Sequence, residues 1–191
     1  MSSKSYPIGV LGHRALGDCG DYDFARLIIQ KILKELKVKR DDVKVISAIS
    51  EGADSLFAEV AISLGIYLET IIPYEGFSDD FSPGESQARY KSIRESSERE
   101  VRLSFSKRCA VAYKKSMEWI VFKSSMIIAL WDGKEVGTIG GTWEAVSLCR
   151  KLKKNLIHID VMNRRINIYS NCSKKYSLFR DINSARISRY I

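Results

Sequence analysis

The sequence predicts an α/β fold in which a doubly wound, mostly parallel sheet of about five or more strands is flanked by helices, with a short basic C-terminal extension. Two observations lead to this prediction. Short apolar runs alternate along the chain with segments whose apolar residues recur at helical spacing. A glycine-rich turn also separates one such run from the helix after it. Strands that alternate with helices form parallel sheets through right-handed crossovers.

The first half of the chain contains three strands in this pattern. Residues 6–11 form the first, and the helix after it has an apolar face of Phe24, Leu27, Ile28, Ile32 and Leu36. Residues 43–49 form the second strand, followed by a strongly periodic helix over residues 53–64. Gly65 stands where a glycine commonly ends a helix. The third strand covers residues 67–72 and stops at Pro73.

The second half begins less regularly. Residues 74–83 are expected to form a loop, residues 84 to about 104 a polar helix, and residues 110–123 a second helix. A strand over 126–131, a helix over 142–152 and a strand over 156–160 then restore the alternation. The apolar residues of 166–169 and 176–179 suit either a short strand or a helix, and the sequence does not decide between them.

Length and composition favour one globular domain. The chain has 191 residues, 45% of them hydrophobic and 28% charged, which is enough for one packed core. We predict one Rossmann-like domain over residues 1–160 and a basic extension over residues 161–191. The extension holds seven of the cations and one acid, so it carries +6 of the net charge of +8. Such a segment can bind nucleic acid or an acidic partner, and the alternative is a solvated extension or an oligomer contact.

Several classes of site are not expected. The four cysteines are scattered, no pair of them has metal-ligand spacing, and there are only two histidines. We therefore expect no metal and no other cofactor. No apolar run approaches the roughly 20 residues that span a bilayer. The N-terminus leads directly into a strand without a signal peptide, so a cytoplasmic protein is expected.

The most informative segment is the glycine-rich turn at residues 137–142. It follows the strand at 126–131 and precedes the helix at 142–152. Glycines let the backbone approach a ligand, and free N–H groups at a helix start attract anions. The turn therefore predicts a phosphate site, in which Thr142 donates its hydroxyl beside the amides of Gly140 and Gly141. An ordinary strand-to-helix turn is the alternative.

Other unusual loops follow the remaining strands, and the carboxyl ends of parallel strands are where such sheets bind ligands. Arg14 is a candidate partner for a phosphate, Glu51 and Asp54 for ribose hydroxyls, and Tyr74 and Trp143 for stacking on a base. The complete candidate ligand-binding set is Gly12, His13, Arg14, Ser50, Glu51, Gly52, Asp54, Pro73, Tyr74, Asp132, Gly133, Gly140, Gly141, Thr142, Trp143 and Glu144.

Each candidate has a plain alternative. Asp54 suits a helix start, where an acid favours the macrodipole. Arg14 suits a surface ion pair, and His13 is more readily a structural hydrogen bonder than a base. Trp131 lies at the end of a buried strand and suits the core.

Taken in order, five blocks resemble the SLOG superfamily of Rossmann-like nucleotide-binding domains, which is named for SMF/DprA proteins and the LOG (lonely guy) hydrolases. The blocks are residues 9–14 (GVLGHR), 50–54 (SEGAD), 72–74 (IPY), 129–133 (ALWDG) and 140–144 (GGTWE). The resemblance covers roughly residues 6–160 and excludes the basic extension.

The resemblance implies two functions. LOG-like members cleave the N-glycosidic bond of nucleoside monophosphates, whereas other SLOG domains, often in anti-phage systems, bind nucleotide-derived signals such as cyclic ADP-ribose species. Related domains also pair through helices beside the cleft, so a homo-oligomer is expected, with residues 84–123 as the candidate surface or else a lid.

The sequence departs from the LOG phosphate motif, Pro-Gly-Gly-x-Gly-Thr-x-x-Glu. Gly141 and Thr142 match its core, but Ala145 occupies the position of the final glutamate, and Glu144 lies one residue earlier. The arginine motif that accompanies hydrolysis has no clear counterpart. We therefore expect a module that binds a nucleotide or ADP-ribose-like signal as a sensor or sequestering protein. A hydrolase that uses Glu144 or Glu51 is the alternative, and nucleic-acid binding is a third.

Overall fold

The computed structural model describes residues 5–14, 22–135, 138–171 and 173–178. Gly17, Cys19, Gly20 and Gly137, together with the end of the basic extension at residues 179–191, lie outside this part of the chain. The described elements are, in chain order, β1 (Tyr6–Gly12), α1 (Tyr22–Lys39), β2 (Val43–Ser47), α2 (Ala53–Ser63), β3 (Tyr67–Ile72), η1 (Phe77–Asp80), α3 (Glu85–Glu95), β4 (Arg99–Arg102), α4 (Ala110–Lys123), β5 (Met126–Leu130), α5 (Thr142–Lys151), β6 (Asn155–Asp160), β7 (Arg165–Ser170) and β8 (Ser173–Leu178).

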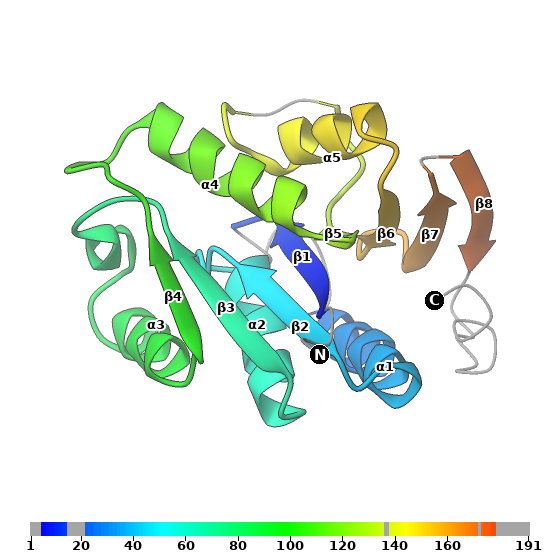
Figure 1. Ribbon diagram of the computed structural model, residues 1–191, viewed down its shortest axis with the longest axis horizontal. Helices are drawn as coiled ribbons and strands as arrows, with labels where there is room; N and C mark the ends of the chain where they lie inside the picture. The colour runs from blue at the N-terminus through cyan, green and yellow to red at the C-terminus, as the bar shows by residue number, and fades with distance from the viewer. Residues whose placement is uncertain (1–4, 15–21, 136–137, 172, 179–191) are drawn as a thin grey trace.

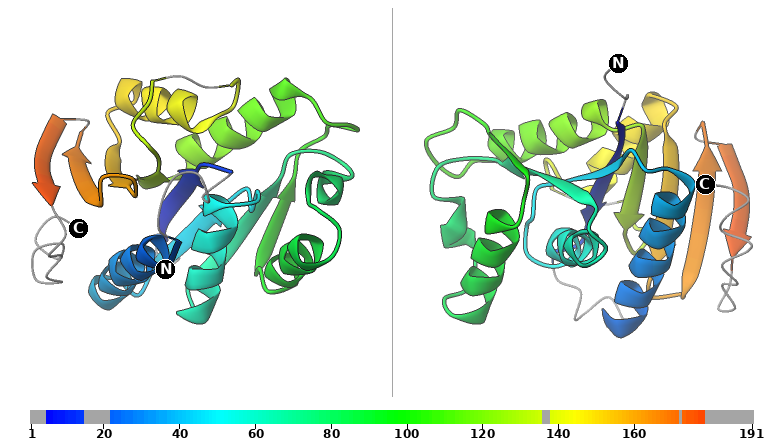
Figure 2. Two further views of the ribbon diagram at one scale, coloured as in Figure 1. Left: turned by 180° about the vertical axis from the view of Figure 1, so that it is seen from behind. Right: turned by 60° about the horizontal axis from the view of Figure 1, so that its bottom comes forward.

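The strands form one eight-stranded sheet in the order β4-β3-β2-β1-β5-β6-β7-β8. The six strands from β4 to β6 are parallel, and β7 and β8 join antiparallel. Helices α1, α2 and α3 cover one face, and α4 and α5 cover the other (Figures 1 and 2). The predicted doubly wound, mostly parallel α/β fold is confirmed.

The central strands are apolar because the sheet is buried on both faces. Along β5 the side chains alternate: Ile128 packs toward α1 and α2, whereas Ile127 and Ala129 pack toward α4 and α5. Gly65 has a φ of 60° just past the end of α2, as expected for a glycine that ends a helix. No helix in the described ranges is long and apolar enough to cross a membrane.

One predicted helix is wrong in part. The segment 84–104 contains the helix α3, but the chain leaves it after Glu95 and forms the edge strand β4. Three of the four residues of β4 are charged, so the sequence gives no apolar signal for a strand. Charged residues are common on edge strands, and here Glu100 forms ion pairs with Arg94 and Arg102. The predicted loop at 74–83 also contains the short helix η1.

The described part of the C-terminal extension continues the sheet. Ile166 and Ile168 of β7 are buried, and β7 pairs with β6. The sequence left strand and helix open here, and the structure has strands. The division at residue 160 stays a prediction.

Candidate functional site

A cleft of about 1140 Å³ lies at the carboxyl ends of the central strands. Strands β1 and β5 are neighbours there, and the helices that follow them, α1 and α5, cover opposite faces of the sheet. This reversal is where doubly wound sheets bind ligands. The sequence-predicted residues that line the cleft are Gly12, His13, Arg14, Ser50, Asp54, Gly140, Gly141, Thr142 and Trp143.

The first two loops are locked together by glycines. A side chain at Gly12 would meet Ala53 of α2, with Cβ atoms 2.3 Å apart. Gly52 has a φ of 90°, and a Cβ there would lie 2.1 Å from the carbonyl oxygen of Arg14. The Ala53 N–H also donates to the His13 carbonyl at 3.0 Å. Gly12 and Gly52 therefore let the loop after β1 pack closely against the loop after β2 and the start of α2. This packing sets the position of the Arg14 backbone at the end of β1.

Arg14 is held by Asp80 of η1. Its Nη2 lies 3.1 Å from Asp80 Oδ2, and the Asp80 side chain is only 4% exposed. Tyr74 and Tyr113 both donate their hydroxyls to the same carboxylate. Burial acts to raise the pKa of Asp80, but these hydrogen bonds and Arg14 outweigh burial and lower it. The carboxylate is therefore ionised at neutral pH and anchors Arg14 beside the cleft.

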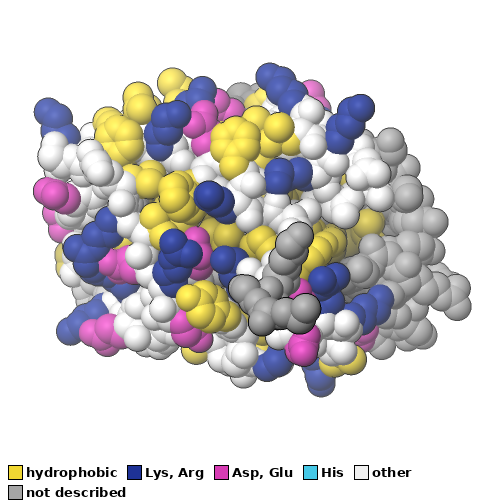
Figure 3. Space-filling view, in the orientation of Figure 1, with side chains coloured by type: hydrophobic (Ala, Val, Ile, Leu, Met, Phe, Trp, Pro, Cys, Tyr) yellow, Lys and Arg dark blue, Asp and Glu magenta, His cyan; other side chains and the backbone are white. Residues whose placement is uncertain are grey.

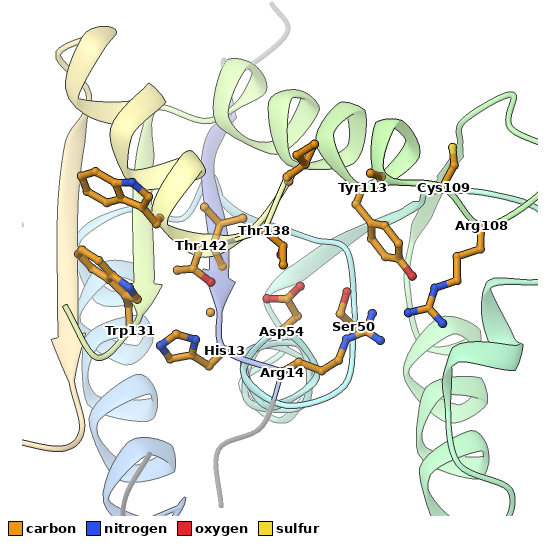
Figure 4. A pocket seen from close by; sticks show the side chains of 17 residues that line it. His13, Arg14, Ser50, Asp54, Arg108, Cys109, Tyr113, Trp131, Thr138 and Thr142 are labelled. Atoms are coloured by element: carbon orange, nitrogen blue, oxygen red, sulfur yellow. The ribbon is translucent and has the colours of Figure 1, made fainter. Parts of the chain in front are cut away.

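Asp54 lies in the first turn of α2 and faces the cleft together with Arg14 and Ser50 (Figure 4). Its carboxylate oxygen Oδ1 is buried and has no hydrogen-bond partner among the described residues. Burial raises the pKa of Asp54 to about 7, although Arg14 and Ser50 act to lower it. A buried polar atom without a hydrogen-bond partner is costly, so Oδ1 offers an acceptor to a ligand, while Ser50 and Gly12 form hydrogen bonds with the Asp54 carboxyl group.

The glycine-rich turn uses two of its amides internally. The Gly140 N–H donates to the carboxylate of Glu144 at 2.7 Å, and the Gly141 N–H donates to the carbonyl of Thr138 at 2.9 Å. Gly140 has a φ of 77°, and a Cβ there would lie 2.6 Å from the backbone nitrogen of Lys114 in α4. The turn is therefore packed against α4. Its glycines serve this packing, and the start of α5 at Thr142 faces the cleft.

Glu144 does not line the cleft. Besides the Gly140 amide, its carboxylate binds Lys114 Nζ at 2.9 Å. The Gly140 hydrogen bond and Lys114 lower its pKa. A first-turn acid that reaches back to an earlier amide is a helix-start arrangement.

The opposite wall of the cleft is aromatic. The rings of Trp131 and Trp143 stack with centroids 5.7 Å apart and an interplanar angle of 21°. Trp131 is 4% exposed and also contacts His158, so it belongs to the core and to the cleft wall at once. Burial lowers the pKa of His158, which keeps this ring neutral. Trp143 is half-buried and is the ring nearest the start of α5.

His13 is fixed by Asp132, which follows β5. The Asp132 N–H donates to His13 Nε2 at 3.2 Å, and Asp132 Oδ1 lies 3.1 Å from the same nitrogen. Burial acts to raise the pKa of Asp132, but the hydrogen bond from the Lys134 N–H and the contact with His13 outweigh burial and lower it. His13 lines the cleft, whereas Asp132 and the neighbouring Gly133 do not.

Three other predicted residues face elsewhere. Glu51 accepts a hydrogen bond from the Ser86 hydroxyl at 2.6 Å and lines a separate, smaller groove against α3. Pro73 is buried, and Tyr74 is buried with its hydroxyl on Asp80. Tyr74 therefore orders the wall behind the cleft instead of offering its ring to it.

Sequence reasoning missed the wall contributed by α4 and the residues before it. Arg108, Cys109 and Tyr113 line the cleft, and Thr138 and Ile139 add to it. Arg108 and Tyr113 come from a segment without glycine or another loop signal, so only the fold brings them to the strand ends. No group of three or more His, Cys, Asp or Glu residues in the described part of the chain is arranged to hold a metal ion.

No known family model and no curated protein sequence matches the chain. Solved structures do match. DNA processing protein A (DprA) from Streptococcus pneumoniae aligns with a TM-score of 0.58 and 15% identity over 81% of this chain and 50% of that one. DprA from Helicobacter pylori, in a structure that concerns its single-stranded DNA binding mode, gives 0.56 and 18% over 80% and 64%. The structural-genomics protein TM1055 gives 0.50 and 13% over 79% and 72%.

The chain thus spans about half the length of the first DprA structure and under two thirds of the second. At such low identity the likeness shows the fold alone. The position of the cleft, at the point where the strand order reverses, is typical of this fold. The resemblance expected from the sequence motifs therefore holds at the level of the fold: the chain has a Rossmann-like α/β fold similar to that of these structures.

Proposed function

We propose that the protein binds a nucleotide or an ADP-ribose-like molecule, linear or cyclic, as a sensor or sequestering protein. The observation that carries this proposal is that Arg14 and Asp54 line the same cleft. A guanidinium group suits a phosphate, and a buried carboxylate oxygen without a partner suits a sugar hydroxyl. The cleft volume of about 1140 Å³ is ample for a nucleotide.

The remaining walls suit the other parts of such a ligand. Thr142 and the N-terminus of α5 offer a hydroxyl and a helix start to an anion. Trp143 offers an aromatic surface to a base. A role in anti-phage defence or counter-defence belongs to the proposal through the SLOG resemblance.

Binding without cleavage is favoured over hydrolysis by the two candidate acids. Glu144 is bound to Lys114 and the Gly140 amide, and Glu51 lies in another groove against Ser86. Neither carboxylate lines the cleft. A LOG-like phosphoribohydrolase is nevertheless the second candidate, because the Gly141–Thr142 core of the motif is present. In that case base release from AMP should be lost in Glu144→Gln.

Nucleic-acid binding is a third candidate. The Helicobacter pylori DprA structure concerns single-stranded DNA binding, and residues 161–191 of this chain hold most of its net positive charge. Binding through this charge should weaken steeply as salt is raised. Lys174→Gln with Lys175→Gln tests it better than truncation, because β7 is part of the sheet.

We also propose that the protein forms a homo-oligomer through residues 84–123. Val111 and Phe122 of α4 are more than half exposed, and Figure 3 shows apolar groups among charged ones on this face. Light scattering after size exclusion tests the proposal, and a monomer at all concentrations would overturn it.

The deciding experiment combines thermal shift and mass spectrometry on one panel: AMP, ADP-ribose, cyclic ADP-ribose isomers, NAD and cyclic nucleotides. Stabilisation with the ligand recovered intact supports a sensor, whereas free base or ribose phosphate indicates the hydrolase. Arg14→Ala should remove the shift. Arg26→Ala is the matched control because Arg26 has a similar exposure, 43% against 41%, and also pairs with a carboxylate.

A further inference from the structure

The α4 end of the cleft contains a cluster of charged and phenolic groups around one carboxylate. Asp80 receives the hydroxyls of Tyr74 and Tyr113 together with Arg14, and Arg108 Nε lies 3.5 Å from its Oδ1. The four partners come from the loop after β1, the loop after β3, the segment before α4 and the first turn of α4. Such a dense shell around one buried acid holds its partners in place.

The cluster has more positive than negative charge. Asp80 offsets one guanidinium charge, so the group formed by Arg14, Arg108 and Asp80 carries one net positive charge. Both guanidinium groups also lie near the Tyr113 ring, at 5.7 and 6.0 Å from its centroid. Each guanidinium has five N–H donors, of which the contacts with Asp80 use only part. Arg14, Arg108 and Tyr113 all line the cleft, and Figure 4 shows them facing the same space.

The glycine-rich turn offers less to an anion than its sequence suggests. The amides of Gly140 and Gly141 are engaged within the turn, and the carboxylate of Glu144 lies beside them with Lys114. Two guanidinium groups at the other end are therefore the stronger attraction for a phosphoryl group.

A second observation points to a ligand at the same end. Asp54 is 7% exposed, and its Oδ1 has no partner among the described residues although it borders the cleft beside Arg14. An acceptor placed next to a cationic pair suits a ligand in which a phosphoryl group and a hydroxyl group are neighbours, as in a ribose phosphate.

We propose that Arg14 and Arg108, held by Asp80, form a phosphoryl-binding subsite separate from the glycine-rich turn, and that the adjoining sugar hydroxyl binds Asp54. The inference rests on the proposed nucleotide-binding function and assigns a direction to the ligand. The phosphoryl group lies toward α4, and the base extends toward Trp143.

The test compares AMP with adenosine, because their affinity ratio isolates the contribution of the phosphate. In Arg108→Gln, AMP affinity should fall about tenfold or more while adenosine affinity is unchanged, since a charge-assisted hydrogen bond is lost. Arg102→Gln is the matched control, with 68% exposure against 65% and a carboxylate partner in each case. Calorimetry measures the affinities, and thermal unfolding verifies that each variant is folded.

The outcomes distinguish a wrong subsite from a wrong function. If AMP binds the wild type and Arg108→Gln keeps the full AMP-to-adenosine ratio, the subsite is wrong and nucleotide binding stands. If loss of the ratio follows only from Thr142→Val, the phosphate binds at the start of α5, and the assigned direction is reversed. If no nucleotide of the panel binds the wild type, the proposed function itself is overturned.

Discussion

At one end of the cleft, side chains from three segments meet around the buried carboxylate of Asp80, whereas at the other end the main chain of the glycine-rich turn closes on itself. The first end presents the charge of Arg14 and Arg108 to the cleft. At the second end, the amides of Gly140 and Gly141 donate hydrogen bonds within the turn, and Gly140 packs against α4. A glycine-rich motif can therefore serve close packing between helices and loops, while the cationic side chains that attract a ligand come from other segments of the chain.

The largest effect is expected from Gly140→Ala, which breaks the packed end. The added Cβ would lie 2.6 Å from Lys114 N, at a φ of 77°, so unfolding free energy should fall by about 3 kcal/mol or more. Gly76→Ala is the control, because Gly76 also has a positive φ, 74°, but the new Cβ would meet only the flexible side chain of Asp79, at 3.3 Å. Its cost should be only about 1–2 kcal/mol. Equal losses in chemical denaturation would show that Gly140 is not needed for packing against α4.

Asp80→Asn breaks the charged end and should cost about 2–3 kcal/mol at pH 7, because two tyrosine hydroxyls and Arg14 lose an ionised partner. The pKa of Asp80 is lowered in the folded protein, so its contribution is present above the ordinary pKa of 3.8 and is lost as pH falls through the lower folded value. Denaturation of wild type and variant should therefore converge at acid pH. The exposed neighbour Asp79, changed to Asn, should show little loss, and a similar loss there would argue against the cluster.

Asp54→Asn tests the second buried acid of the cleft, whose Oδ1 has no hydrogen-bond partner among the described residues. The pKa of Asp54 is raised from 3.8 to about 7, so between these values the folded protein retains a proton that the unfolded chain has released. Stability therefore falls as pH rises through this window and is constant above it. Wild type relative to Asp54→Asn should lose about 2–3 kcal/mol between pH 5 and pH 8. A difference that does not change with pH would mean that Asp54 is ionised throughout.

Trp143→Phe should have the smallest effect, a loss of about 0.5–1 kcal/mol in AMP binding, because a smaller ring remains against Trp131. Fluorescence gives a second readout, since the change on adding AMP should shrink in this variant. Trp119→Phe, on α4 beside Lys123 and outside the cleft, should leave both the affinity and the fluorescence change intact. If instead Trp119→Phe removes the signal, the ligand acts near Trp119 and not at the cleft wall formed by Trp143.

Much of the fold was predictable because a buried strand, such as β5, has a continuous run of apolar residues. In the helices, apolar residues recur at helical spacing instead. Strand β4 was not, because an edge strand needs no apolar run and its charged residues pair along the edge. The strand-end loops bring Arg14 and Asp54 to the cleft, since parallel strands end at one edge, and their role in binding stays a prediction. Arg108 and Tyr113 could not be found in this way, because their place depends on how α4 crosses the sheet. The partners of Glu144 and Tyr74 likewise depend on contacts between distant segments.

Helix α4 contacts both ends of the cleft. Tyr113 binds Asp80 at one end, and the backbone at Tyr113 and Lys114 supports Gly140 at the other, while Val111 and Phe122 are exposed to solvent. A displacement of this helix would alter both ends together. If a molecule docked on the exposed side of α4 and a ligand in the cleft each prefer one position of the helix, each changes the affinity of the other by the same factor.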